Sequence, residues 1–170
     1  MNYIINNEEI QFTQIPSTGA TSNIYISVDK KYIIKQIIEY KEYDVYKREK
    51  YILLFLNEYK FDWCPQLICS NDNNQLLVLN YCGELLSDIN KPINLVEQYN
   101  NIINDLESLN IQHNDIKNSE LLIKDNKLYI CDFGWASINN NHSCNIELWN
   151  GTKPCGYIND RIALNNLNFK

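Results

Sequence analysis

Residues 111–137 read IQHNDIKNSELLIKDNKLYICDFGWAS, and this stretch decides how the rest of the chain is interpreted. Two short, largely apolar runs, ELLIK and KLYIC, flank the dipeptide Asp125-Asn126. Apolar runs separated by two turn-forming residues are typical of a β-hairpin with a two-residue loop. The stretch therefore predicts a tight hairpin in the second half of the chain.

The predicted turn also sets the register of the hairpin. If Lys124 pairs with Lys127, Glu120 lies opposite Cys131, and Asp132 follows one position later. Two carboxylates are then near neighbours at the open end, where like charges repel unless a divalent cation lies between them. The spacing favours a metal site at Glu120 and Asp132, and a pair of solvated loop acids is the alternative.

A third carboxylate lies just before the hairpin. Residues 113–117, HNDIK, resemble the His-Arg-Asp-Leu-Lys catalytic loop of eukaryotic-type protein kinases, and residues 132–134, DFG, resemble the metal-binding Asp-Phe-Gly of that family. The resemblance implies that Asp115 orients the attacking hydroxyl and accepts its proton, and that Lys117 neutralises the γ-phosphate. It also implies that Asp132 holds Mg²⁺ between the phosphates of ATP. Because Glu120 adds a second carboxylate to this site, Mn²⁺ is expected to compete well with Mg²⁺.

An acidic residue on an apolar helix face provides the next test of the resemblance. The helical spacing in residues 40–60 places Glu49 on a stripe with Val45, Ile52, Leu53 and Leu56. A carboxylate on such a face is costly unless a cation meets it. YIIK, which ends at Lys35, resembles the family's Val-Ala-Ile-Lys, and REKYILLFL resembles the helix that carries its partner glutamate. We therefore expect Lys35 to pair with Glu49.

The resemblance further implies an ATP-binding site that is formed mainly by residues 17–82. Only Gly19 remains where the family's phosphate loop has three glycines, and Ile33 replaces a small alanine over the adenine. Leu79 corresponds to the gatekeeper and Leu122 to the floor of the pocket. The implied ATP-binding residues are Ser17, Gly19, Ser22, Ile24, Ile33, Lys35, Glu49, Leu79, Tyr81, Cys82 and Leu122.

The order of predicted elements gives an α+β fold in one domain, residues 1–170. The resemblance divides it into a small antiparallel β N-lobe with one helix (about 1–80), a hinge (about 80–84) and a reduced, mainly helical C-lobe (about 85–170). Glu120 replaces the asparagine that binds the second metal in the family. Since only 36 residues follow Gly134, most of the peptide-docking lobe is expected to be absent. Residues 138–170 are expected to be poorly anchored on their own, because an Asn run and weak periodicity supply little apolar surface. Where this segment is ordered, it is expected to pack on the catalytic-loop side or against a partner chain.

Composition narrows the class of protein. The chain has 170 residues, of which 45% are hydrophobic, as expected for a globular domain. Its formal charge of −6 and the lack of a basic stripe argue against nucleic-acid binding. No apolar run is long enough to span a membrane, and the first residues lack a secretory pattern, so we expect an intracellular, cytoplasmic protein. Six cysteines without a Cys-x-x-Cys pair argue against zinc and disulfides.

Three functions fit these observations. The first is ATP-dependent phosphoryl transfer to a serine or threonine hydroxyl of an unidentified protein. Lys117 favours the serine/threonine specificity. The charged positions of the family motifs that are intact here favour an enzyme, and they are Lys35, Glu49, Asp115 and Asp132. The second is a pseudokinase that binds nucleotide or acts as a scaffold, favoured by the altered phosphate loop and by Glu120. The third is a small-molecule phosphotransferase, although such enzymes commonly show His-Gly-Asp without the lysine.

Overall fold

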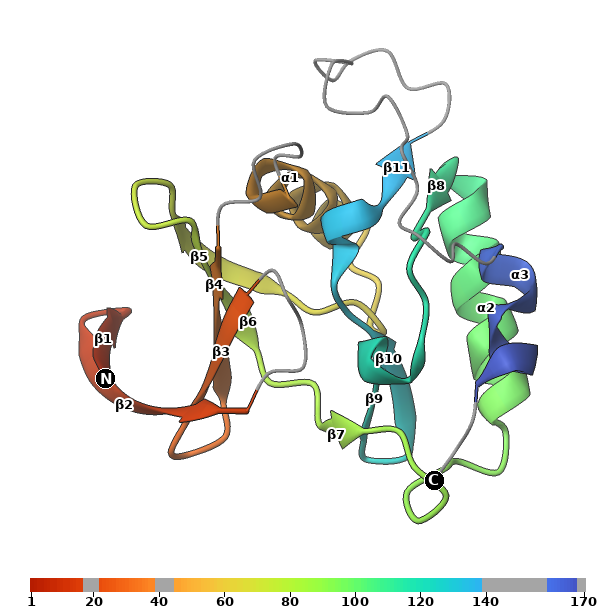
Figure 1. The fold of residues 1–170 in the computed structure, drawn as a ribbon, viewed down its shortest axis with the longest axis horizontal. Helices are drawn as coiled ribbons and strands as arrows, with labels where there is room; N and C mark the ends of the chain where they lie inside the picture. The colour runs from red at the N-terminus through yellow and green to blue at the C-terminus, as the bar shows by residue number, and fades with distance from the viewer. Residues whose placement is uncertain (17–21, 39–44, 139–158, 168–170) are drawn as a thin grey trace.

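The computed structural model describes residues 1–16, 22–38, 45–138 and 159–167 and has a mixed α+β fold (Figure 1). This confirms the predicted α+β class. An antiparallel sheet forms the N-terminal part, and α1 (Val45–Glu58) lies beside it. The C-terminal part contains two short sheets and the helices α2 (Leu95–Ser108) and α3 (Asp160–Ala163).

Six strands form the N-terminal sheet in the order β1-β2-β3-β4-β6-β5. All neighbouring strands are antiparallel. The alternation of side chains along β6 explains how the sheet buries both of its faces: Leu76 and Val78 pack with Phe12, whereas Leu77 and Leu79 face the larger core. The strands are β1 (Asn2–Ile5), β2 (Glu8–Ile15), β3 (Ser22–Ser27), β4 (Tyr32–Ile37), β5 (Leu67–Asn71) and β6 (Leu76–Asn80).

The helix α1 buries the stripe that its sequence predicts. Val45, Ile52, Leu53 and Leu56 are each at most 2% exposed and belong to the larger core. Glu49, on the same stripe, is 1% exposed. A carboxylate is thus carried into the interior on the apolar face of this helix, as the spacing required.

The predicted hairpin and its register are confirmed. Lys127 pairs with Lys124, and the backbone N–H of Cys131 donates to the carbonyl of Glu120 at 2.9 Å. A short strand, β7, extends the hairpin into a three-stranded sheet, and β8 pairs with β11. The remaining elements are β7 (Glu84–Leu85), β8 (Ile111–Gln112), η1 (Asn118–Glu120), β9 (Leu121–Lys124), β10 (Lys127–Ile130), η2 (Phe133–Trp135), β11 (Ser137–Ile138) and η4 (Leu164–Asn166).

The connection between β6 and β7 is attached to both parts of the molecule. The backbone N–H of Tyr81 donates to the carbonyl of Lys31 at 2.8 Å, on the sheet side. Gly83 has a φ of 104°, and a Cβ at this position would lie 2.0 Å from the carbonyl oxygen of Ile123 in β9. Only glycine allows this close approach of two backbones.

The C-terminal residues that the structure describes pack against α2 and the loop that contains Asp115. The Tyr99 hydroxyl donates to the backbone carbonyl of Asp160 at 2.6 Å, and Arg161 contacts Glu107. Asp160 also accepts the backbone N–H groups of His113 and Asn114, so residues 159–167 pack on the side of the Asp115 loop, as expected for an ordered segment. Residues 139–158 and 168–170 of the predicted segment lie outside the described residues.

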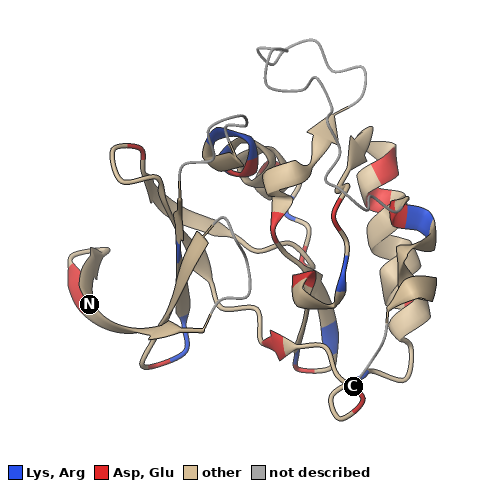
Figure 2. Cartoon of the chain, viewed as in Figure 1, with Lys and Arg blue, Asp and Glu red and all other residues tan. Residues whose placement is uncertain are grey.

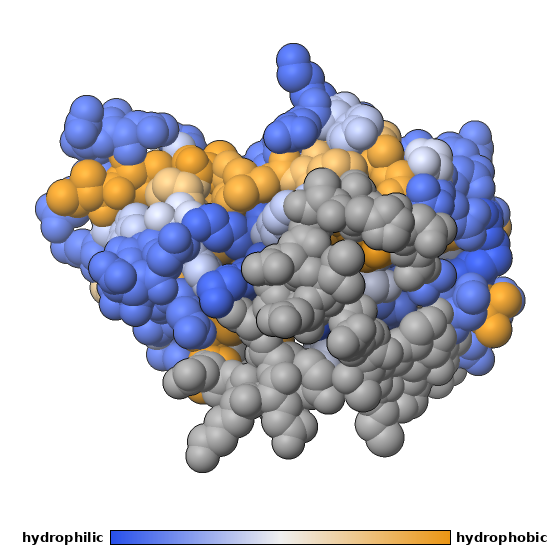
Figure 3. Space-filling model, turned by 90° about the horizontal axis from the view of Figure 1, so that it is seen from above, coloured by the Kyte–Doolittle hydropathy of each residue, from blue (hydrophilic) through white to orange (hydrophobic). Residues whose placement is uncertain are grey.

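Charged residues can be followed along the chain, and hydrophobic residues on one face of the molecule. Figure 2 shows acidic and basic residues interspersed along the described chain. Seen from above, hydrophobic residues form a band with hydrophilic residues on both sides (Figure 3). Within the residues that the structure describes, no helix is long and apolar enough to cross a membrane.

Candidate active site

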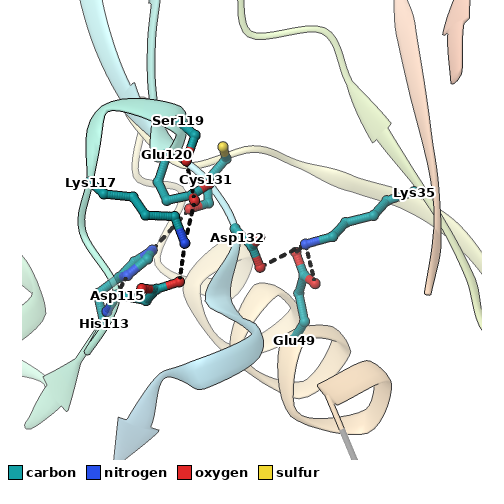
Figure 4. A network of polar contacts seen from close by, with 9 residues as sticks. All are labelled: Lys35, Glu49, His113, Asp115, Lys117, Ser119, Glu120, Cys131 and Asp132. Carbon is teal, nitrogen blue, oxygen red and sulfur yellow. Dashed lines mark hydrogen bonds and ion pairs between the residues drawn. The ribbon is translucent and has the colours of Figure 1, made fainter. Parts of the chain in front are cut away.

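Lys35 is the centre of a buried cluster of charges between the two parts of the molecule. Its side chain, on β4, is 6% exposed. The Nζ atom lies 2.9 Å from Oε1 and 2.7 Å from Oε2 of Glu49, of which only Oε1 has hydrogen-bond geometry. The same Nζ lies 2.7 Å from Oδ1 of Asp132 (Figure 4). The predicted pair of Lys35 and Glu49 is confirmed, and Asp132 joins it from 97 residues away.

The three charges of this cluster are unequal. Burial raises the pKa of Glu49 to about 7, an effect that the attraction of Lys35 does not overcome. Burial also acts to raise the pKa of Asp132, but the adjacent Lys35 ammonium outweighs it and the pKa is lowered. Burial acts to lower the pKa of Lys35, yet the two carboxylates raise it. One lysine therefore stays charged beside two acids, and Glu49 is the acid that more readily takes a proton.

The segment that follows β10 is fixed against α1. Asp132 has φ 66° and ψ 69°, a left-handed conformation that is uncommon outside glycine and tolerated best by asparagine and aspartate. A Cβ on Gly134 would lie 2.6 Å from Cγ1 of Val45, so any larger residue would require the Val45 side chain or this segment to shift. The ring of Phe133 packs on the ring of His113 with centroids 4.9 Å apart. The residues that follow Asp132 are thus packed against α1 and against His113.

His113 connects this segment to the loop that contains Asp115. Its Nε2 lies 2.9 Å from the carbonyl of Cys131, and its Nδ1 lies 3.3 Å from the backbone N–H of Asp115. Because a carbonyl only accepts and a backbone N–H only donates, the ring carries its hydrogen on Nε2. Both nitrogens are then satisfied in a side chain with no exposed surface.

A second cluster of charges surrounds Lys117 (Figure 4). Its Nζ lies 2.7 Å from Oδ2 of Asp115 and 3.1 Å from Oε1 of Glu120. The Ser119 hydroxyl donates to the same Oε1 at 2.7 Å. Partial burial acts to lower the pKa of Lys117, but the two carboxylates raise it, so the lysine stays charged. Sequence reasoning brought these acids to one place but did not foresee that Lys117 links them.

Two further residues hold the Asp115 loop and were not identified from the sequence. Asp160 accepts the backbone N–H groups of His113 at 2.5 Å and of Asn114 at 3.0 Å. Asn114, at φ 68°, donates through Nδ2 to the carbonyl of Trp135 and to Oγ of Ser137, each at 2.9 Å. An acid at the start of a short helical stretch was the only sequence signal for Asp160, and it does not reveal a contact 47 residues away.

Asp132 lies between the two clusters (Figure 4) and interacts electrostatically with Glu120. Burial, followed by the charge of Asp132, raises the pKa of Glu120. Among the described residues, no group of three or more histidine, cysteine, aspartate or glutamate side chains could hold a metal ion. Mg²⁺ is commonly bound by one or two carboxylates together with phosphate oxygens. The donor set of Asp132 and Glu120 therefore suits a metal that arrives with a phosphorylated ligand.

The residues predicted to bind ATP lie on several elements around these clusters. Ile24 is opposite Lys35 in the sheet, and Ile33 is opposite Leu79. Ser22, at the start of β3, and Cys82 are buried, whereas Tyr81 and Leu122 are half-buried. Ser17 and Gly19 lie outside the described residues. For all the residues of this set, a role in ATP binding stays a prediction.

No protein-family model matches this chain, and no curated protein matches it. The interpretation of the site therefore depends on its own geometry and on the motifs that the sequence contains.

Proposed function

We propose that this chain is an ATP-dependent phosphotransferase with a protein-kinase-like fold, which transfers the γ-phosphate of ATP to a serine or threonine hydroxyl of another protein. The observation that carries the proposal is the buried junction of Lys35 with Glu49 and Asp132. Three segments contribute one residue each to this junction, which supports the role that the resemblance implies for the lysine, binding of the α- and β-phosphates. Burying three charged groups together costs hydration free energy, and a cluster with no role beyond an ion pair could lie at the surface without this cost.

Each charged group then has a distinct task. Lys35, oriented by Glu49, binds the α- and β-phosphates. Asp115 accepts the proton of the acceptor hydroxyl while the hydroxyl oxygen attacks the γ-phosphorus. The bond between the γ-phosphorus and its bridging oxygen breaks, and ADP leaves. Lys117, which lies 2.7 Å from Asp115, offsets the negative charge on the transferred group.

The charge balance of the site supports a divalent cation as the cofactor. Four carboxylates, those of Glu49, Asp115, Glu120 and Asp132, surround two lysines. When all are ionised, two negative charges remain without a partner, and ATP would add more. Asp132 and Glu120 would hold a divalent cation, which would offset this excess and the negative charge of the phosphates. Mg²⁺ and Mn²⁺ both suit carboxylate ligands.

Phosphoryl transfer is the direct test. The protein is incubated with γ-labelled ATP and either Mg²⁺ or Mn²⁺, with generic protein substrates and with itself. We expect labelled product, and a loss of about 100-fold or more in Asp115→Ala, because the proton acceptor is removed. Asp88→Ala, which changes an exposed acid elsewhere, should match the parent. Equal transfer by Asp115→Ala, or none by the parent, contradicts the proposal.

A second candidate is a nucleotide-binding module with little catalysis, and the contacts of Lys117 favour it. This lysine already binds Asp115 at 2.7 Å and Glu120 at 3.1 Å, so the proton acceptor and the additional acid are both engaged. Binding of an ATP analogue that is lost in Lys35→Met, combined with absence of transfer by the parent, would favour this function.

A further inference from the structure

Lys117 lies between two carboxylates that differ in their surroundings. Its own side chain is 56% exposed, whereas that of Asp115 is 18% exposed and that of Glu120 is 7% exposed. Both Lys117 and the Ser119 hydroxyl approach the same oxygen of Glu120, Oε1. Glu120 is therefore a buried acid whose cationic partner reaches it from the solvent side.

The backbone around Glu120 is fixed, and the side chain of Lys117 is not. The N–H of Glu120 donates to the carbonyl of Lys117 at 3.0 Å, and its carbonyl accepts the N–H of Cys131 at 2.9 Å. Ser119 holds the carboxylate itself. The long lysine side chain has none of these restraints and can leave at little cost, because exposed ion pairs contribute little. If a second cation approaches Glu120, Lys117 is the group that moves.

Glu120 cannot hold both cations at one oxygen. A divalent metal binds a carboxylate oxygen at about 2.0–2.1 Å for Mg²⁺, whereas Nζ of Lys117 lies 3.1 Å from Oε1. Glu120 has a second oxygen, but two cations on one carboxylate still repel each other strongly in a partly buried site. Asp132, the other acid at this point, has its own lysine in Lys35. Glu120 therefore has to give up its contact with Lys117 before it can act as a metal ligand.

We propose that Lys117 and a divalent cation compete for Glu120. Without metal, Glu120 and Asp115 hold Lys117 between them, and with metal Glu120 becomes a ligand and releases Lys117 from this contact. The inference rests on the proposed function in one respect, since it gives the released lysine its task at the transferred phosphate. Metal binding and the availability of Lys117 for the transferred phosphate are then coupled through the carboxylate of Glu120.

Binding of Mn²⁺ alone, followed by the electron paramagnetic resonance signal of the free ion, tests the competition. The variants are Lys117→Met, Glu120→Gln and the double variant, with Lys127→Met as a matched control that removes a lysine paired elsewhere, with Asp62. We expect Lys117→Met to bind Mn²⁺ about three- to fivefold more tightly than the parent, because the competing ion pair is worth less than about 1 kcal/mol. In the Glu120→Gln background the same change should alter the affinity by less than about twofold. Lys127→Met should match the parent.

Three results overturn the inference: no tightening in Lys117→Met, the same tightening in both backgrounds, or no Mn²⁺ bound by any variant. The second result would mean that the lysine acts through its general field, because Asp132 is still present. Circular dichroism checks that each variant is folded, and Lys117→Gln replaces Lys117→Met if the latter is not. Phosphoryl transfer is measured separately. Coupling without transfer supports the inference and contradicts the proposed function, and transfer without coupling does the reverse.

Discussion

The two lysines of the site are held in different ways. Lys35 is 6% exposed, and its two acids come from α1 and from the segment after β10. Lys117 is 56% exposed, and its two acids lie two and three residues away in the same loop. One cluster joins distant parts of the chain, and the other joins neighbours. Each cluster thus combines one lysine with two carboxylates, but only the first connects elements that are distant in the sequence.

The difference in burial sets what each cluster costs and contributes. A buried charge that loses its partner is strongly destabilising, because nothing else replaces the lost hydration. An exposed ion pair contributes little to stability, since water and salt screen it. Lys35 should therefore contribute strongly to the stability of the fold, whereas Lys117 can change partners at little cost, as the proposed competition requires.

Lys35→Met gives the largest expected effect. The change leaves Glu49, 1% exposed, and Asp132 beside each other without a cation. We expect the free energy of unfolding to fall by about 3 to 5 kcal/mol, measured by urea denaturation at neutral pH. The double variant Lys35→Met/Glu49→Gln should recover part of the loss, because one buried charge is removed with the lysine. A loss below about 1 kcal/mol would show that this cluster behaves like a surface pair.

The buried cluster could be predicted in part because its signals are local. The spacing of α1 placed Glu49 on an apolar face, which requires a cation. A two-residue turn fixed the register of β9 and β10 and so brought Glu120 beside Asp132. In both cases the pattern repeats within a few residues, where the period of a helix or strand determines which side chains share a face.

The parts that could not be predicted depend on distant contacts. Asp160 binds two backbone N–H groups of the Asp115 loop, and no periodicity connects a residue to a loop 46 residues earlier. The strands β8 and β11 have two residues each, too few for an alternating pattern. The contact of Lys117 with Glu120 could not be predicted from the resemblance, because the resemblance implies that each residue acts toward a ligand and not toward the other.

Glu49→Gln tests the unequal sharing of charge at Lys35 and gives an intermediate effect. In the folded protein burial raises the pKa of Glu49 to about 7, from an ordinary value of 4.5. Between these values the folded state holds more protons than the unfolded state, so the stability of the parent should fall as pH rises through this window. The contribution of one proton is at most about 1.4 kcal/mol per pH unit.

The difference between parent and Glu49→Gln isolates this titration. Urea denaturation at pH values from about 5 to about 8 should show a flatter profile for Glu49→Gln than for the parent. Parallel profiles would mean that Glu49 is ionised throughout and that Lys35 satisfies both acids.

Lys117→Met gives the smallest expected effect on stability and completes the comparison. The lysine is 56% exposed, and within the described part of the chain its ion pairs are to Asp115 and Glu120, so its removal should change the free energy of unfolding by less than about 1 kcal/mol. Raising the salt to about 0.5 M should reduce even this difference, because screening already weakens the pair in the parent. Lys35→Met should show no such salt dependence, since its cluster is buried. If Lys117→Met instead destabilised the protein as much as Lys35→Met, the loop cluster would be part of the folding core, and its lysine could not change partners as we propose.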